Sequence, residues 1–597
     1  MHSDSPEIEY ERRLNARRET ARALQRREER ISNLRLLVFA AGLIVLWASW
    51  WMQWFSIYWI VVPIVAFVAL AISHDRTIRG LKRARLAIAH YERCIARVQD
   101  KWAGTGRGGE DLQPAEHPYA ADLDLFGKGS LFELLCTART RAGEQVLANW
   151  LTALANPETV RARQDALKEL RNGLDLREDL ALLGADINTG ILPEQLARWA
   201  TAPQAFASMG PRIVAFVVGL YNVLALVAWA VFDTGPNFFL LGLIIAVLSA
   251  RHIGGNAVKE VLSAIDEPGR ELDVLAKVLA RLEQERFEHG RLRDLHAALT
   301  TEGMNASACI MRLRKLIAAH EMRGNQLFAI VALMLMWDVH FAYAFEAWRK
   351  RYGARVQQWL DALGELEALC SLAAYHYERP DDPFPEIVEG KALFDGVEIG
   401  HPLLSSGACV RNTVRLDDAT RVFIVSGSNM SGKSTLLRTV GINVVLALAG
   451  APVRARSLRV SPLAIGATLR VQDSIQSGDS RFYAEIRRLQ MLSEIARGPL
   501  PLLFLLDEIL HGTNSHDRKI GAEAVIRRFL ASGGIGFVTT HDLSLTQAVD
   551  QFAPHAINVH FEDHIENGKL AFDYTMRPGV VQKSNALELM RGIGLDV

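Results

Sequence analysis

Two long apolar stretches lie almost end to end near the start of the chain. Residues 36–54 and 57–73 contain no charged side chain, and each is close to the length that crosses a hydrocarbon core of about 30 Å. Basic side chains flank the outer ends: Arg26, Arg27, Arg30 and Arg35 before them, and Arg76, Arg79, Lys82, Arg83 and Arg85 after them. The positive-inside rule puts such ends in the cytoplasm. The pattern therefore predicts a transmembrane helical hairpin at residues 31–75, with a cytoplasmic N-terminus.

A second pair of apolar stretches occupies residues 213–232 and 238–253, joined by a turn that contains Pro236. The second arm is short, because its uninterrupted apolar residues end at Ala250. It spans only if Arg251 extends to the interface; a re-entrant or interfacial arm is the alternative. We predict a second hairpin at residues 206–253. Residues 327–337 are also apolar, but a stretch of about eleven residues favours a buried core helix over a span.

The remaining pattern is helical up to a cluster of prolines at residues 380–385. Residues 1–30 are a basic cytoplasmic arm, either a helix along the membrane surface or an unstructured segment. Residues 76–119 form a basic linker, and residues 120–205 and 254–379 form an all-α region interrupted by the second hairpin. After the prolines, short β-branched strands alternate with helices, which is typical of an α/β domain, here residues 380–597.

Composition adds little to this organisation. The chain has 67 Lys plus Arg and 67 Asp plus Glu among 597 residues, so overall charge gives no reason to expect a polyanion as partner. Its five cysteines are scattered without a Cys-x-x-Cys pair. This spacing argues against a disulfide framework or a zinc site and fits a reducing cytoplasm.

A hydrophobic strand at residues 422–426 runs into Gly-Ser-Asn-Met-Ser-Gly-Lys-Ser-Thr at residues 427–435. This pattern is a phosphate-binding loop: glycines let backbone N–H groups turn inward, and the following helix adds its positive end. Lys433 is expected to bind the β and γ phosphates, and Ser434 to bind Mg²⁺. The predicted nucleotide-binding residues are Gly427, Asn429, Gly432, Lys433, Ser434 and Thr435, and the predicted ligands are ATP and Mg²⁺.

Two further strand ends carry candidate catalytic groups. Residues 502–506 form an apolar strand that ends at Asp507 and Glu508. Asp507 would hold Mg²⁺ and Glu508 would polarise the attacking water. Residues 535–540 end at His541, which would contact the γ-phosphate. The alternative is that the paired acids cap the next helix and that the histidine is structural.

Four motifs resemble, in this order, the ATPase domain of the MutS mismatch-repair family: the phosphate loop, residues 473–485, residues 506–513 and Thr539-Thr-His. Residues 123–131, 140–143 and 163–164 resemble the start of that family's helical lever domain. The resemblance implies a homodimer with composite sites, in which Ser477, Gly478 and Ser480 of one subunit face the γ-phosphate held by the other. Three residues depart from the family pattern: Ser428, Ser431 and Arg481.

The resemblance implies an α/β P-loop ATPase domain preceded by an all-α lever domain, with two transmembrane hairpins added. The family's mismatch-reading domain has no counterpart in residues 1–120, and the second hairpin lies near where relatives insert their DNA clamp. We expect a membrane-anchored ATPase whose ATP-driven closure moves the hairpins on an unknown client. The alternatives are a membrane-tethered protein that binds branched or mismatched DNA and, less consistent with the sequence, an ABC-type transporter.

Overall fold

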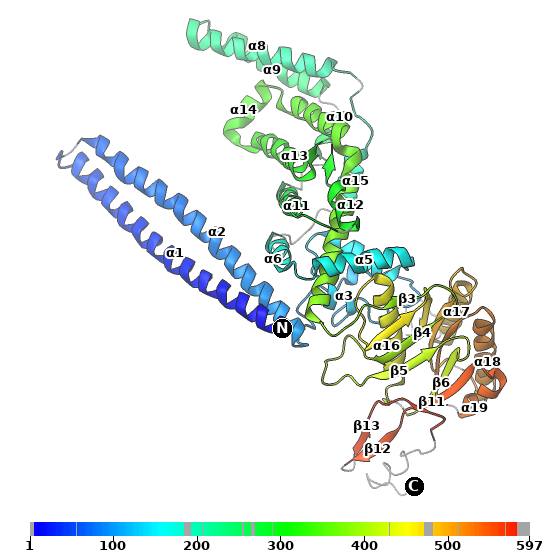
Figure 1. Cartoon of the computed structure of the whole chain (residues 1–597). Coiled ribbons are helices and arrows are strands. Elements are labelled where there is room, and N and C mark those ends of the chain that lie inside the picture. The colour runs from blue at the N-terminus through cyan, green and yellow to red at the C-terminus, as the bar shows by residue number, and fades with distance from the viewer. Residues whose placement is uncertain are drawn as a thin grey trace. The chain divides into compact units, whose positions relative to one another are not determined.

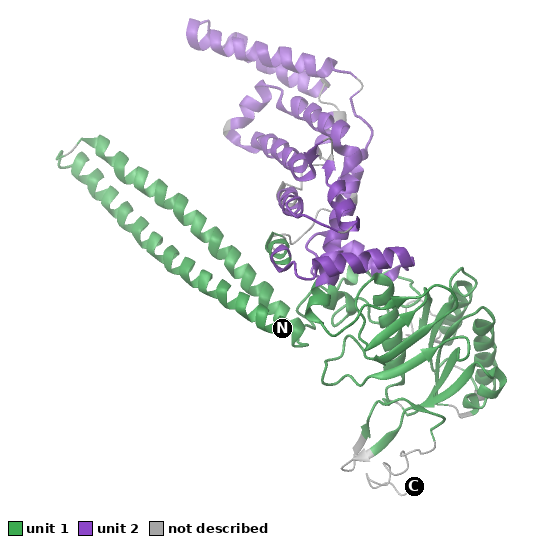
Figure 2. Cartoon of the chain, in the orientation of Figure 1, with its two compact units in different colours: residues 1–135, 177–185, 374–597 green, residues 136–176, 186–373 purple. Residues whose placement is uncertain are grey.

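The computed structural model describes residues 5–581, apart from residues 55, 184–192, 207, 254–255, 264–268, 289, 302, 429, 471–480, 511–512, 542 and 567–568. The chain divides into two compact units (Figures 1 and 2). Unit 1 comprises residues 1–135, 177–185 and 374–597, and unit 2 comprises residues 136–176 and 186–373. The units divide the chain differently from the expected domains, since residues 120–135 group with the ATPase region.

Unit 1 begins with a long antiparallel helical hairpin of α1 (Pro6–Trp50) and α2 (Val61–Val98), joined by the 3-10 turn Ile57–Ile60. The basic arm is helical rather than unstructured. It is the first part of α1, and it pairs with the second half of α2 through buried Ala21, Leu81 and Ala84 and an ion pair of 2.8 Å between Arg18 and Glu92. The small side chains at these positions let the helices approach closely, so residues 6–35 and 75–98 form a helical stalk.

The ATPase part of unit 1 is built on two larger sheets and a separate antiparallel pair, β12–β13. The larger sheet has the strand order β14-β11-β6-β10-β9-β8, parallel except for β14, and the smaller has the order β3-β7-β4-β5. The strands are β3 (Glu386–Ile387), β4 (Phe394–Ile399), β5 (Asn412–Leu416), β6 (Val422–Ser426), β7 (Ser457–Val460), β8 (Ala464–Thr468), β9 (Leu502–Asp507), β10 (Ile535–Thr540), β11 (Ala556–His560), β12 (Asp563–Glu566), β13 (Lys569–Phe572) and β14 (Arg577–Pro578).

Helices cover this parallel sheet, as buried parallel strands require. Strands β6, β9 and β10 are buried along nearly their whole length, and one core cluster joins Phe504 and Val538 to Ile526 and Phe529 of a covering helix. The helices are α16 (Lys433–Ala449), α17 (Arg481–Ile495), α18 (Ser515–Ala531), α19 (Leu543–Thr546) and α20 (Val549–Phe552). The expected α/β domain after a helical region is thus confirmed.

A segment before α3 (Leu131–Leu135) is inserted into the ATPase part from far away in the sequence. Leu123 and Leu125 are completely buried. Asp122 accepts hydrogen bonds from the backbone N–H groups of Leu469 (2.7 Å) and Arg470 (2.8 Å) and pairs with Arg488 at 2.6 Å. This segment therefore holds the end of β8 and the helix α17 together.

Unit 2 is entirely helical apart from the short pair β1 (Thr300–Thr301) and β2 (Met304–Asn305), within its described residues. The helix α15 continues into unit 1, as does α6. The helices that make up this part of the chain are α4 (Arg141–Thr152), α5 (Pro157–Leu170), α6 (Leu174–Leu183), α7 (Pro193–Thr201), α8 (Gly210–Phe232), α9 (Asn237–Ile253), α10 (Asn256–Ser263), α11 (Gly269–Leu282), α12 (Gly290–Ala298), α13 (Ala306–Glu321), α14 (Gln326–Met334) and α15 (Trp337–Glu378).

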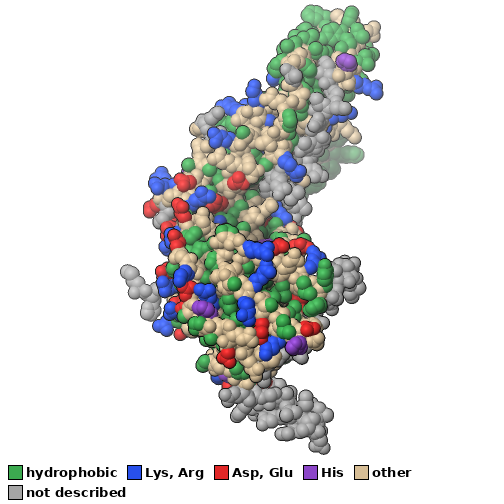
Figure 3. Space-filling model, turned by 90° about the vertical axis from the view of Figure 1, so that its right-hand side faces the viewer, with side chains coloured by type: hydrophobic (Ala, Val, Ile, Leu, Met, Phe, Trp, Pro, Cys, Tyr) green, Lys and Arg blue, Asp and Glu red, His purple; other side chains and the backbone are tan. Residues whose placement is uncertain are grey.

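The apolar part of unit 2 contains three helices rather than two. The hairpin α8–α9 packs on α14, and the amide of buried Asn222 donates a 3.1 Å hydrogen bond to the carbonyl of Met334. The expectation of a buried core helix at residues 327–337 is met only in part, because Ala332, Met334 and Met336 are buried whereas the side chain of Ile330 is 61% exposed. Figure 3 shows hydrophobic side chains gathered on the surface at the α8–α9 end.

By length and composition, three described helices can cross a membrane: α1, the helix that runs from Ile57 to Val98, and α8. The apolar helix α9 is shorter, and α14 meets α15 at a bend of 73°, a geometry found in broken spans and re-entrant loops. Side chains at the tip of the first hairpin are strongly exposed, with Tyr58 at 82% and Trp51 at 76%. Such exposed apolar area needs a covering other than water.

Candidate active site

The strand order brings the three predicted motifs to one edge of the larger sheet. β10 lies between β6 and β9, with Thr540 paired to Ser426 and Thr539 paired to Asp507. Because parallel strands end at the same edge, the phosphate loop after β6, the acids after β9 and His541 after β10 lie side by side. The sheet thus explains how segments about a hundred residues apart form one site.

The phosphate loop has a backbone that only glycine supplies easily. Gly427 has φ 146° and Gly432 has φ 108°. A Cβ on Gly427 would lie 2.9 Å from the carbonyl oxygen of Phe561 and 2.9 Å from Oγ of Ser431. A larger residue at this position would therefore clash with these atoms and distort the loop. The helix α16 begins at Lys433, so its positive N-terminus meets the loop directly.

Lys433 is held inside the loop. Its side chain is 4% exposed, and Nζ donates to the carbonyls of Gly427 (2.9 Å) and Ser428 (2.8 Å). Nζ also lies 3.4 Å from Nε2 of His541 and 3.8 Å from a carboxylate oxygen of Glu508. Burial lowers the pKa of Lys433, and the charges of Glu508 and Asp507 oppose that shift. A buried ammonium at the N-terminus of a helix is a strong anion-binding group.

The two residues that depart from the family pattern in the loop both place hydroxyl groups there. Oγ of Ser428 and Oγ of Ser431 are buried and have no hydrogen-bond partner among the described residues. A buried hydroxyl without a partner is costly, and phosphate oxygens are suitable acceptors for it. The hydrogen-bond donors of the loop therefore fit a nucleoside triphosphate.

The oxygen atoms beside the loop fit Mg²⁺. Oγ of Ser434 donates to one carboxylate oxygen of Asp507 at 2.6 Å, and Oγ1 of Thr539 donates to the other at 2.5 Å. Hydroxyl and carboxylate oxygens are the hard ligands that Mg²⁺ takes, usually together with phosphates and water. Thr539 also accepts from the backbone N–H of Glu508 at 3.0 Å, so one hydroxyl orients both acids.

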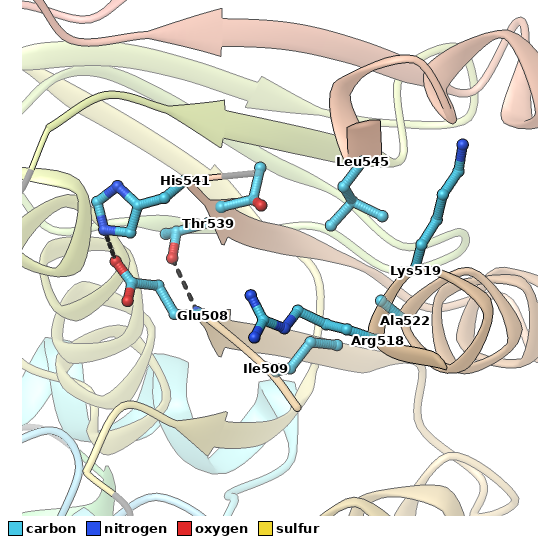
Figure 4. A pocket seen from close by; sticks show the side chains of 9 residues that line it. Glu508, Ile509, Arg518, Lys519, Ala522, Thr539, His541 and Leu545 are labelled. Atoms are coloured by element: carbon cyan, nitrogen blue, oxygen red, sulfur yellow. Dashed lines mark hydrogen bonds and ion pairs between the residues drawn. The ribbon is translucent and has the colours of Figure 1, made fainter. Parts of the chain in front are cut away.

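Glu508 and His541 form the centre of the predicted catalytic site. Figure 4 shows their side chains pointing toward each other, with an ion-pair contact between Nε2 of His541 and a carboxylate oxygen of Glu508. Glu508 has φ 48°, a left-handed backbone that is costly for a glutamate and characteristic of functional sites. Glu508, His541 and Arg518 of α18 line one pocket. Arg518 donates to the carbonyls of Leu510 and Thr513.

The remaining predicted site residues are only partly testable in the structure. Thr435 lies in the first turn of α16, where its carbonyl accepts from Thr439. Asn429, Ser477, Gly478 and Ser480 lie outside the described residues. The arrangement of the family-like composite site therefore stays a prediction.

Sequence reasoning missed three residues near the site. Thr539 orients the acids, and the sequence marked it only as part of the Thr539-Thr-His motif, with no role of its own. Asp122 fixes both Leu469 and Arg488, which flank the predicted trans segment. Tyr574 is 43% exposed beside the phosphate loop, with its ring 3.1 Å from the Cβ position of Gly432. Tyr574 is distant in sequence from every motif, and the motif at residues 123–131 beside Asp122 gave no indication of its partners.

Together, these features define a phosphate-loop ATPase core. Residues 423–596 match the family model described as MutS domain V, and the C-terminal part of the chain is therefore an ATPase domain of the MutS type.

Two relatives illustrate the extent of the similarity. The chain is 33% identical over 253 residues to "DNA mismatch repair protein MutS 2" of Halobacterium salinarum, and 32% identical over 253 residues to "DNA mismatch repair protein MutS" of Staphylococcus aureus. Each match covers 40% of this chain and 28% of the relative. The chain thus matches little more than a quarter of the length of these relatives, and its resemblance to the lever domain remains a prediction.

Proposed function

We propose that this protein is a membrane-anchored ATPase that works as a homodimer through its ATPase domains and uses ATP hydrolysis to change the geometry of its apolar hairpins. The observation that carries the proposal is that unit 1 joins an ATP site and a long apolar hairpin through direct contacts. The client on which the motion acts is unknown.

The site residues have separate roles in this proposal. Lys433 and the N–H groups of the loop bind the phosphates, and Ser434 and Asp507 hold Mg²⁺. Glu508 orients and polarises the attacking water, while His541 holds the Glu508 carboxylate and lies next to Lys433, close to the γ-phosphate position. When bound, ATP supplies the transferred phosphoryl group and Mg²⁺ neutralises its charge.

A chain of polar contacts within unit 1 supports coupling between this site and the stalk. Asp100, just after α2, pairs with Arg379 at 2.5 Å and accepts from the backbone N–H of Ser406 at 2.8 Å. Oγ of Ser406 accepts from Arg454 at 2.7 Å, and the backbone N–H of Arg454 donates to Asn443 at 2.8 Å. Asn443 belongs to α16, the helix that begins at Lys433. A shift of α16 on nucleotide binding therefore has a short path to the hairpin.

Membrane anchoring rests on the exposed apolar helices. The stretches 36–54 and 57–73 combine span length, exposed aromatic tips and basic flanks, and α8 adds a further long apolar helix. Ordinary soluble surfaces do not expose contiguous apolar area of this extent. We place the N-terminus, the stalk and the ATPase domain on the cytoplasmic side.

The direct test measures ATP hydrolysis and hairpin motion in one preparation of the full-length protein in lipid nanodiscs. Glu508→Gln should retain ATP binding and lower hydrolysis by about 100-fold or more, whereas Lys433→Ala should lose binding. Glu523→Gln, which changes a partly exposed acid on α18, serves as the matched control. Protease digestion of residues 99–106 and 206–253 should then differ between Glu508→Gln and wild type in the presence of ATP. Identical digestion patterns in the two proteins would show that hydrolysis is not coupled to the hairpins.

The names of the matched relatives support one alternative, a membrane-tethered protein that acts on DNA. Linear and branched duplexes titrated with ATP and Mg²⁺ across a range of salt would test it. Tight binding with a steep salt dependence would indicate many phosphate contacts and would favour this alternative. Lack of binding at low salt, in protein that hydrolyses ATP, would favour a protein or membrane client.

A further inference from the structure

We propose that unit 2 binds one anionic phospholipid in a pocket lined by α9, α10 and the bend from α14 to α15. This inference rests on the proposed membrane anchoring and goes beyond it by naming a site and a ligand class. The pocket has a volume of about 720 Å³, within the range of small-molecule sites. Its lining residues come from α9, α10, the turn Met322–Gly324, α14 and the start of α15.

The pocket exists because the chain changes direction at Met336. This residue has φ 52°, and the axes of the helices on either side differ by 73°. The bend separates α14 from the line of α15 and leaves a concave wall of apolar side chains, including Val258, Leu262, Ala332 and Leu333. Val258 and Leu262 are buried, so the wall is anchored in the unit.

One side of the pocket is rigid and aromatic. The ring of Trp337 lies 4.9 Å from that of Phe341 and 5.1 Å from that of Phe328, centroid to centroid. Its Nε1–H donates to the carbonyl of Ala319 at 3.2 Å. A tryptophan fixed with its polar edge bonded and its ring against apolar residues is typical of the headgroup level of a membrane.

The charges around the pocket select an anion. Both carboxylate oxygens of Asp338 already have partners, Nε2 of His320 at 3.1 Å and Arg323 at 2.7 Å. Lys259 also lines the pocket, is exposed, and makes no ion pair with another described residue. With the single acid neutralised, Lys259 and the remaining N–H groups of Arg323 are suited to a phosphate group.

The position along the chain indicates that this phosphate belongs to a lipid. Ala250 lines the pocket and is the last residue of the apolar stretch of α9, directly before Arg251 and His252. Cationic and apolar residues therefore lie next to each other at this end of α9. A basic pocket between membrane helices on the cytoplasmic side is the arrangement that binds anionic headgroups. The acyl chain would lie along Ala332 and Leu333, a surface that a free phosphate ion leaves uncovered.

The experiment counts bound lipids by native mass spectrometry on full-length protein in detergent. The probes are dioleoyl-phosphatidylglycerol, dioleoyl-phosphatidylcholine and inorganic phosphate. Lys259→Gln removes one pocket cation, and Ala329→Trp fills the pocket. Their matched controls are Lys315→Gln, an exposed lysine of α13, and Leu248→Trp, an exposed position of α9 outside the pocket. ATP hydrolysis by each variant reports that unit 1 is folded, and protease resistance of residues 256–373 reports that unit 2 is folded.

We expect wild type and both controls to retain one phosphatidylglycerol in preference to phosphatidylcholine. Lys259→Gln should weaken this binding about fivefold, the effect of one headgroup cation, and Ala329→Trp should abolish it. Equal retention of both lipids, or unchanged binding in both pocket variants, would overturn the proposal. Competition by millimolar inorganic phosphate would overturn the lipid as ligand and leave a phosphate site. Extraction of wild-type protein from native membranes by alkaline carbonate would instead overturn the membrane anchoring itself.

Discussion

The two hairpins pack on their neighbouring helices through different kinds of interaction. At the base of the α1–α2 hairpin, Arg97 pairs with Glu378 at 2.5 Å with both side chains buried, and the hydroxyl of Tyr10 donates to the same carboxylate. A second buried acid, Glu178, accepts from Tyr91 at 2.6 Å and pairs with Arg17 at 2.7 Å. At the α8–α9 hairpin, contacts with α14 involve small residues such as Gly219 and a single amide, that of Asn222.

This difference indicates which attachment can move. A buried ion pair is strongly destabilised when one partner is displaced, so the stalk is held in one register on the residues that lead into the ATPase domain. Small-residue packing with one hydrogen bond resists sliding far less. We therefore infer that the stalk follows the ATPase domain as a rigid extension, whereas α8 and α9 can shift on α14.

The largest expected effect is at the base of the stalk. Glu378→Ala leaves the buried guanidinium of Arg97 without its partner, which should lower the free energy of unfolding by about 3–5 kcal/mol. Denaturant unfolding of the detergent-purified protein measures this. Glu92→Ala is the control, because it breaks the exposed pair with Arg18 and should cost less than about 1 kcal/mol. Equal losses in the two variants would show that the buried pair does not anchor the stalk.

A second, somewhat smaller effect distinguishes the units by pH. Burial raises the pKa of Glu367 in unit 2 to about 7, although the hydroxyl of Thr140 and the backbone N–H of Arg139 stabilise its charged form. Its described hydrogen bonds come from the hydroxyl of Thr140 and from the backbone N–H groups of Arg139 and Thr140, whereas Glu378 is paired with a guanidinium group. The folded unit therefore keeps a proton that the unfolded chain releases near pH 4.5. Its stability should fall as pH rises from about 5 to about 7, by on the order of 3 kcal/mol.

Glu367→Gln should remove most of this pH dependence, since an amide cannot ionise. The stability of unit 2 at pH 5.5 and at pH 8, with unfolding monitored by protease digestion, checks the result. Glu321→Gln, at an exposed position of α13, should retain the wild-type pH profile. A wild-type unit 2 that is equally stable at both pH values would contradict the assigned role of Glu367.

The smallest expected effect is at the second hairpin. Asn222→Ala removes the hydrogen bond to the Met334 carbonyl and should lower stability by about 1 kcal/mol. Cysteine crosslinking between α8 and α14 should then form more varied products in the presence of ATP. Tyr221→Phe, which loses only an exposed bond to the carbonyl of Phe238, is the matched control. A loss of stability as large as that caused by Glu378→Ala would contradict the proposed difference between the two hairpins.

The sequence predicts those parts of the molecule in which chemistry is local. The loop around Lys433, the acids after β9 and the histidine after β10 each sit in a short motif, and their convergence follows from strand order in a parallel sheet. The ATPase domain is accordingly confirmed. The paired stalk was missed because its many arginines mask the narrow apolar seam of Ala21, Leu81 and Ala84.

Long-range contacts were the other limit. Asp122 joins the segment after β8 to α17 across more than 300 residues of sequence, and nothing in the local pattern around it indicates that partner. The bend at Met336 is equally invisible, because a left-handed backbone at a methionine has no sequence signature. Both features depend on tertiary packing rather than on propensity.

The length of α1 has a consequence for what the ATPase domain can reach. At 1.5 Å per residue, residues 6–35 extend about 45 Å beyond the apolar stretch. With that stretch in the bilayer, the base of the stalk stands well clear of the headgroups. In the proposed membrane-anchored arrangement, soluble molecules would therefore have room between the membrane surface and the ATPase domain, and a client would not need to be embedded in lipid.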